Sequence, residues 1–81
     1  MIDDIRELIT EHGRLPVPVA TLSDGDDLYA AGLTSFAAVQ LMLALEDRFE
    51  VEFPETMLNR RSFASVDAIA SCLHQLSAKA A

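Results

Sequence analysis

Ser35 is the residue whose type and position best suit covalent chemistry. It follows Gly32-Leu33-Thr34 and opens an apolar run that extends to Phe49. A serine at a helix start can cap the helix, because its side-chain oxygen accepts a hydrogen bond from a free N–H of the first turn. Thr34 could make that bond instead, which would leave the serine hydroxyl free. The sequence therefore offers two interpretations of Ser35, a helix cap or a hydroxyl that is modified.

The other reactive side chains form no catalytic or metal-binding pattern. His12 and His74 stand at the ends of different predicted helices, without Cys or carboxylate at ligand spacing around them. Cys72 has no neighbour placed to activate its thiol. The acidic run 24–27 resembles the start of a calcium loop, but Leu28 stands where the loop needs an oxygen ligand and Tyr29 where it needs glycine. The run is therefore predicted to be a turn. We therefore expect no metal site and no autonomous enzyme.

Acidic residues dominate the charge. The chain has 13 Asp and Glu against 6 Lys and Arg, a formal net charge of −7. This balance argues against nucleic-acid and anionic-membrane partners and favours a partner with a positive surface. Five acids between Glu46 and Glu55 are either a solvated face or a docking face. Arg60 and Arg61, the one adjacent basic pair, are predicted to cap a helix end or to pair with nearby carboxylates.

The chain length and composition indicate one small globular domain, residues 1–81. Its 81 residues, 51% of them hydrophobic, suffice for a single core. A lone cysteine fits a reducing, cytoplasmic setting. The N-terminus shows no secretory signal, and the longest apolar run, Leu41 to Leu45, is too short to cross a bilayer. We expect a cytoplasmic monomer.

Hydrophobic periodicity predicts an all-α fold, a small bundle of three longer helices and one short one. The predicted elements are helices over about 3–12, 35–50 and 65–76, one helical turn over 55–59, and an end that frays over 77–81. Ser65 is the predicted N-cap of the last helix. Met57 and Leu58 are predicted to dock the short turn, and Phe63 to anchor the segment after it. A long first loop, Arg14 to Thr34, is predicted to be an ordered crossover pinned by its own leucines and valines, with a short helical turn before Leu22.

The helix that begins at Ser35 carries two apolar stripes. The stripe assigned to the core comprises Ala38, Leu41, Met42, Leu45 and Phe49. A second stripe, Phe36, Val39 and Leu43, has the spacing i, i+3, i+7. We expect Val39 and Leu43 to be exposed for a partner, whereas Phe36 is as well suited to burial under the long loop as to exposure.

Together these residues are similar to an acyl carrier protein, of the superfamily that includes fatty-acid, polyketide and peptidyl carriers. The run from Asp27 to Phe36 resembles the family's Asp-Leu, Gly, Ser-hydrophobe signature. Residues that match the pattern of the family's second helix and the proline after it are Val39, Leu41, Leu45, Glu46, Phe49 and Pro54. The resemblance covers most of the chain.

The resemblance implies that Ser35 carries 4′-phosphopantetheine, attached by a phosphopantetheinyl transferase that uses magnesium and coenzyme A. The terminal thiol would hold an acyl or aminoacyl group as a thioester. Other implied partners are a loading ligase and a downstream acyl or aminoacyl transferase. The implied docking residues are Thr34, Phe36, Val39, Gln40, Leu43 and Asp47.

The chain departs from the common carrier patterns at the serine. Thr34 and Phe36 stand where fatty-acid carriers usually have Asp and Leu, and Gly32 is the one glycine where peptidyl carriers usually show two. These departures look more like a dedicated, stand-alone carrier, one class of which is loaded by a ligase resembling a class II aminoacyl-tRNA synthetase. Acyl and aminoacyl cargo both remain open. The alternative function is a non-catalytic acidic helical module that binds a protein partner.

Overall fold

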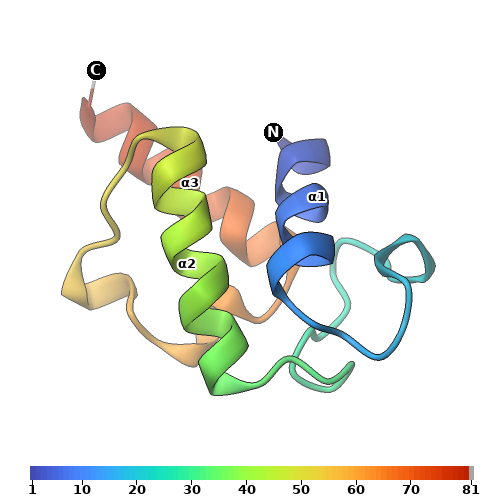
Figure 1. The fold of residues 1–81 in the computed structure, drawn as a ribbon. Coiled ribbons are helices and arrows are strands. Elements are labelled where there is room, and N and C mark those ends of the chain that lie inside the picture. The colour runs from blue at the N-terminus through green and yellow to red at the C-terminus, as the bar shows by residue number, and fades with distance from the viewer. Residues whose placement is uncertain (81) are drawn as a thin grey trace.

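Three α-helices form the frame of the protein in its computed structural model (Figure 1): α1 (Ile2–His12), α2 (Ser35–Phe49) and α3 (Val66–Ala80). The structure describes residues 1–80, with side chains through residue 77. Three 3-10 turns lie in the connections: η1 (Val19–Thr21), η2 (Glu55–Met57) and η3 (Arg60–Phe63). Residues 1–80 contain no strand, so the predicted all-α class is confirmed. The helical turn predicted over 55–59 is present as the 3-10 turn η2.

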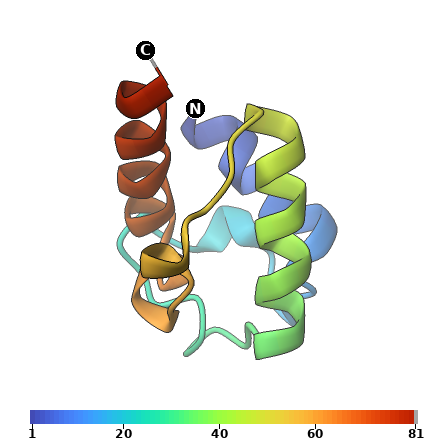
Figure 2. The ribbon, with the colours of Figure 1, turned by 90° about the vertical axis from the view of Figure 1, so that its left-hand side faces the viewer.

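The helices surround a single core. α1 packs against both α2 and α3, and α2 and α3 begin at the same end of the molecule (Figures 1 and 2). The link after α2 runs down the side of the molecule that faces the viewer in Figure 2. The largest fully buried side chains are Ile5, Ile9, Leu28, Leu41, Leu45, Val66, Ile69 and Leu73. All but Leu28 recur at helical spacing, as the periodicity predicted.

The first loop is ordered, as predicted, and a partly buried contact with α1 fixes it. The guanidinium of Arg6 donates to the backbone oxygens of Val19 and Leu22 at 3.0 and 2.7 Å. It also donates to the Asp24 carboxylate at 2.7 and 3.1 Å. This one side chain satisfies three acceptors of the loop, and the helical turn predicted before Leu22 is present as η1.

Backbone hydrogen bonds join the far part of the loop to the start of α3. Leu28 N donates to Ala64 O at 2.7 Å, and Asp67 N donates to Asp24 O at 3.0 Å. Leu28 itself is fully buried. The acidic run is thus a turn whose carboxylates serve the fold, since Asp27 also accepts from Tyr29 N at 2.9 Å.

The link between α2 and α3 is held by aromatic packing. Phe53 and Phe63 are buried with ring centroids 5.3 Å apart, a favourable tilted arrangement. Phe63 thus anchors this link as predicted, and Met57 is buried as predicted. Leu58, predicted to dock inward with Met57, is instead 49% exposed, because its side chain lines an open surface pocket.

Helix boundaries differ from the predictions by a few residues. α2 ends at Phe49, because Glu50 takes the left-handed conformation with φ of 53°. Ser65 caps α3, as predicted, by accepting from Ala68 N at 3.0 Å. α3 continues to Ala80, beyond the predicted end near Leu76. The predicted fraying over 77–81 falls mostly on residues whose side chains lie outside the described part of the chain.

No helix within residues 1–80 is both long enough and apolar enough to span a lipid bilayer.

Gly32 should be the least replaceable glycine. Its φ is +120°, and a Cβ there would lie 2.6 Å from Pro16 Cδ. Strain of this kind costs on the order of 1–3 kcal/mol, so Gly32→Ala should lower the free energy of unfolding by about 2 kcal/mol. Urea denaturation followed by circular dichroism measures the loss.

Gly25→Ala is the matched control, because a Cβ at Gly25 meets only an Asp67 oxygen at an ordinary 3.7 Å. Equal losses in the two variants would contradict this account of Gly32.

Candidate functional site

The start of α2 exposes a serine that the helix does not use. Thr34 is the N-cap, and its Oγ1 accepts a hydrogen bond from Ala37 N at 3.0 Å. The interpretation of Ser35 as the cap is therefore wrong. Ser35 is the first helical residue, its side chain is exposed, and its hydroxyl makes no hydrogen bond to the described residues. Of the two hydroxyls at this helix start, the threonine stabilises the fold and the serine is available for chemistry.

The electrostatic setting of Ser35 suits an anion. The first turn of a helix presents unpaired N–H groups and the positive end of the helix dipole. The first turn of α2 carries no acidic residue that would repel a negative group. A phosphate ester on Ser35 would therefore lie in a favourable field.

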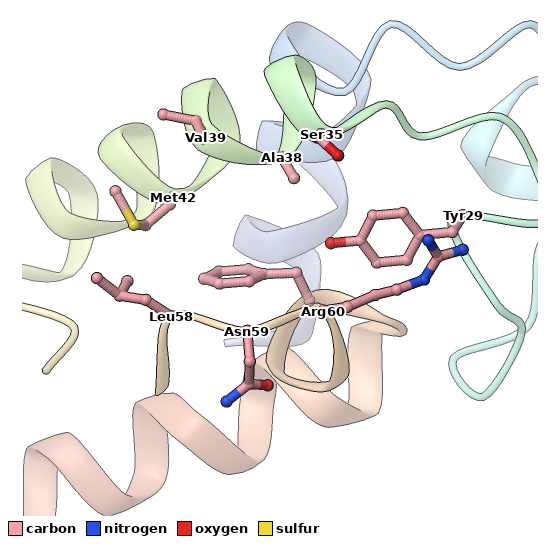
Figure 3. Close-up of a pocket in the computed structure, with 9 residues that line it drawn as sticks. Tyr29, Ser35, Ala38, Val39, Met42, Leu58, Asn59 and Arg60 are labelled. Atoms are coloured by element: carbon pink, nitrogen blue, oxygen red, sulfur yellow. The ribbon is translucent and has the colours of Figure 1, made fainter. Parts of the chain in front are cut away.

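A pocket of about 340 Å³ opens beside Ser35, between α2 and the η2–η3 segment (Figure 3). Its walls are mainly apolar and aromatic, with a few polar groups at the edge, as in most ligand pockets. The lining residues are Tyr29, Ser35, Ala38, Val39, Met42, Leu58, Asn59, Arg60 and Phe63. Met42 was assigned to the core from the sequence, but it is only partly buried because one side of it faces this pocket.

Tyr29 and Arg60 form the polar end of the pocket. The guanidinium carbon of Arg60 lies 4.2 Å from the centroid of the Tyr29 ring, within the range of a cation–π contact. Partial burial raises the pKa of Tyr29, the positive charge of Arg60 opposes that rise, and the nearby Asp27 adds to it. Arg60 was predicted to cap a helix or pair with a carboxylate; it stacks on an aromatic ring instead, because Tyr29 lies directly beneath it.

The outer surface of α2 is apolar, as predicted. Phe36, Val39 and Leu43 are 66%, 50% and 51% exposed. The open question over Phe36 is thus decided, since the long loop leaves it uncovered. On the buried side, Ala37 joins the core at 2% exposure although the sequence analysis did not assign it there.

The predicted docking residues of α2 border two different hollows of the surface. Val39 borders the pocket beside Ser35. Gln40, Leu43 and Asp47 line a separate groove between α2 and α1. The Thr34 hydroxyl is exposed but is occupied by the cap. The exposed ridge of α2, formed by Phe36, Val39 and Leu43, therefore lies between two hollows. A partner that contacts both hollows must cover the ridge.

The acidic cluster is less uniform than its sequence suggested. Glu46 is partly buried and accepts a hydrogen bond from Phe53 N at 2.9 Å, so it organises the link after α2. Arg48 pairs with Asp4 and Glu7 of α1 at 3.0 and 3.4 Å. The acid that remains exposed on the groove side of α2 is Asp47.

The sequence analysis missed the part that Tyr29, Asn59 and Arg60 play in the pocket. Tyr29 lies inside the Asp27–Phe36 run, but nothing in the sequence alone pairs it with a side chain 31 positions later. That contact depends on how the two connections fold against each other.

The sequence matches a known family over nearly its whole length. Residues 3–73 match the family described as phosphopantetheine attachment site. The chain belongs to this family. It is a carrier protein, which bears phosphopantetheine and holds an acyl or aminoacyl group for partner enzymes without catalysing their reactions.

Relatives of this carrier protein include aminoacyl carriers. It is 60% identical, over 80% of its own length and 78% of the relative's, to the aminoacyl carrier protein of Agrobacterium fabrum. Its structure superposes with a TM-score of 0.90 on a chain in the crystal structure of an engineered Bradyrhizobium japonicum glycine:[carrier protein] ligase complexed with carrier protein from Agrobacterium tumefaciens and AMP. That match has 54% identity and covers 91% of this chain and 99% of the other.

A solution structure of an Agrobacterium tumefaciens protein is also similar to this carrier protein. The TM-score is 0.77 at 51% identity, and both chains are covered completely. The fold expected from the resemblance is thus confirmed.

The free energy of unfolding tests whether Thr34, and not Ser35, stabilises the start of α2. Thr34→Ala should lower the free energy of unfolding by about 1 kcal/mol, the usual cost of losing an N-cap. Ser35→Ala should change it by less than about 0.5 kcal/mol, as for a surface substitution. Urea titrations of the two variants beside the unmodified wild type measure both values. An equal loss in Ser35→Ala would show that the serine does support the helix.

Proposed function

We propose that Ser35 is the residue that carries 4′-phosphopantetheine. The observation that carries this proposal is the exposed serine hydroxyl at the first position of α2, left unused because Thr34 caps the helix. Its position at the end of the Asp27–Phe36 run supports the same assignment. A phosphopantetheinyl transferase would join the Ser35 oxygen to the phosphopantetheine phosphorus of coenzyme A. The nucleotide part of coenzyme A would leave, and the transferase would take the serine proton.

We also propose that the cargo is an amino acid. The relative that is 60% identical is an aminoacyl carrier protein, and a chain 54% identical occurs in a complex with a glycine:[carrier protein] ligase. An amino acid:carrier protein ligase would load the pantetheine thiol, and a downstream transferase would take the aminoacyl group from it. The buried, free thiol of Cys72 is compatible with a reducing cytoplasm, where we place the protein as a monomer.

The exposed ridge of α2, Phe36, Val39 and Leu43, is our proposed docking surface for these enzymes. Its apolar side chains start one position after Ser35, so an enzyme that holds the ridge would have the modified residue within reach. Gln40 and Asp47 border the ridge on the α1 side and would supply polar contacts at its rim.

Intact-mass measurement tests the attachment residue. Wild type, incubated with coenzyme A, magnesium and a promiscuous phosphopantetheinyl transferase, should gain one phosphopantetheine group. Ser35→Ala should gain none, because the accepting oxygen is absent. Circular dichroism of Ser35→Ala controls for folding. A gain of mass in the folded variant would overturn the assignment.

Loading kinetics test the docking surface. Leu43→Gln keeps helix propensity but removes an exposed apolar side chain, whose partial burial by a partner would contribute about 1–2 kcal/mol. The KM of a glycine:[carrier protein] ligase for the phosphopantetheine-bearing variant should therefore rise roughly tenfold.

Val17→Thr is the matched control, because Val17 is an exposed apolar side chain of the first loop, outside α2. Its KM should stay near the wild-type value. Equal KM values for Leu43→Gln and wild type would remove Leu43 from the docking surface.

A further inference from the structure

We propose that Arg60, held against the face of Tyr29, is the counter-ion of the phosphodiester formed on Ser35. This inference rests on the proposed function, because it requires the phosphopantetheine to be attached at Ser35. It assigns a binding role to a residue far from the serine in sequence and on a different element, η3.

Charge and position together single out Arg60. The protein has a net charge of −7 and only six basic residues. Arg6 and Arg48 pair with carboxylates at 2.7 and 3.0 Å. Among the described residues, no carboxylate lies within ion-pair distance of Arg60. Arg14 and Arg61 also have no carboxylate of these residues within that distance, but neither lines the pocket beside the serine. Arg60 therefore keeps its charge available for an anion brought to the pocket.

The stack on Tyr29 leaves the N–H groups of the Arg60 guanidinium free to donate to an anion. A guanidinium that lies over an aromatic ring uses its flat face, whereas its N–H groups point outward in the plane. Those N–H groups can donate in pairs to the oxygens of a phosphate. The ring also restricts the long side chain in advance, so less entropy is lost when the anion binds.

Ser35 and Arg60 lie on the same pocket. Figure 3 shows the Ser35 hydroxyl pointing from the start of α2 toward Tyr29, and Arg60 running from η3 along the same ring. A phosphodiester on Ser35 would thus have the first-turn N–H groups of α2 on one side and the guanidinium on the other. Each contributes positive potential at a site that has no acidic residue in the adjoining helical turn.

The phenol of Tyr29 can report whether Arg60 binds the phosphodiester. Tyr29 is the only tyrosine and there is no tryptophan, so ultraviolet absorbance reports ionisation of this one phenol. Arg60 lowers the pKa of Tyr29. A phosphodiester that engages Arg60 would cancel that effect and raise the pKa of Tyr29 when the group is attached.

The experiment compares the unmodified and phosphopantetheine-bearing forms of wild type, Arg60→Gln and Arg61→Gln. Arg61 is the matched control, since it is exposed, carries the same charge and does not line the pocket. Intact mass first establishes that each protein is fully modified. Absorbance titration then gives the pKa of Tyr29, and ³¹P NMR follows the single phosphorus as salt is raised.

In the unmodified form, Arg60→Gln should raise the pKa of Tyr29 and Arg61→Gln should leave it nearly unchanged. Attachment should raise the Tyr29 pKa in wild type and Arg61→Gln, and by no more than roughly half as much in Arg60→Gln. The ³¹P signal of wild type and Arg61→Gln should move with salt, because salt screens the ion pair. The ³¹P signal of Arg60→Gln should change little as salt is raised.

Identical pKa changes and identical salt responses in all three proteins would overturn the role of Arg60. That outcome would leave the attachment at Ser35 intact, because the masses establish it independently. Failure of wild type to gain mass would instead refute the proposed function, and the inference with it.

Discussion

The hydrogen bond from Ala37 N to Thr34 Oγ1 is the contact on which the site depends. It starts α2 at a fixed residue and satisfies one first-turn N–H group with the threonine side chain. The serine that follows is therefore free and exposed. Gly32 makes this start possible, because its φ of +120° brings the loop past Pro16 without a clash. The positive φ of Gly32 and the Thr34 cap thus determine where the Ser35 hydroxyl is placed.

The rest of the molecule holds this start in place and leaves one side of α2 uncovered. Arg6 binds the middle of the first loop to α1. The buried side chain of Leu28 anchors the later part of the loop in the core. α2 contributes Leu41 and Leu45 to the core, but no other described element covers its outer ridge. A protein that only needed to be stable would gain by covering such apolar surface. A carrier that must be held by several enzymes needs it exposed.

Much of this could be predicted from the sequence, because the relevant signals are local. Helical periodicity identified all three α-helices, the pairing of Thr34 with Ser35 raised the possibility of a free hydroxyl, and the i, i+3, i+7 spacing identified the exposed ridge. Contacts that join distant segments could not be predicted in this way. The stack of Arg60 on Tyr29, the hydrogen bond from Phe53 N to Glu46 and the exposure of Leu58 all depend on how the connections pack. Such packing leaves no periodic pattern.

The central claim is that the phosphopantetheine is attached to Ser35 and not to its neighbour Thr34. Tandem mass spectrometry of the modified protein tests it most directly, because fragmentation between the two residues assigns the added mass to one hydroxyl. The account predicts the group on Ser35, with the Thr34 side chain unmodified and retained in the cap. The group on Thr34, or on another residue of a correctly folded protein, would contradict it.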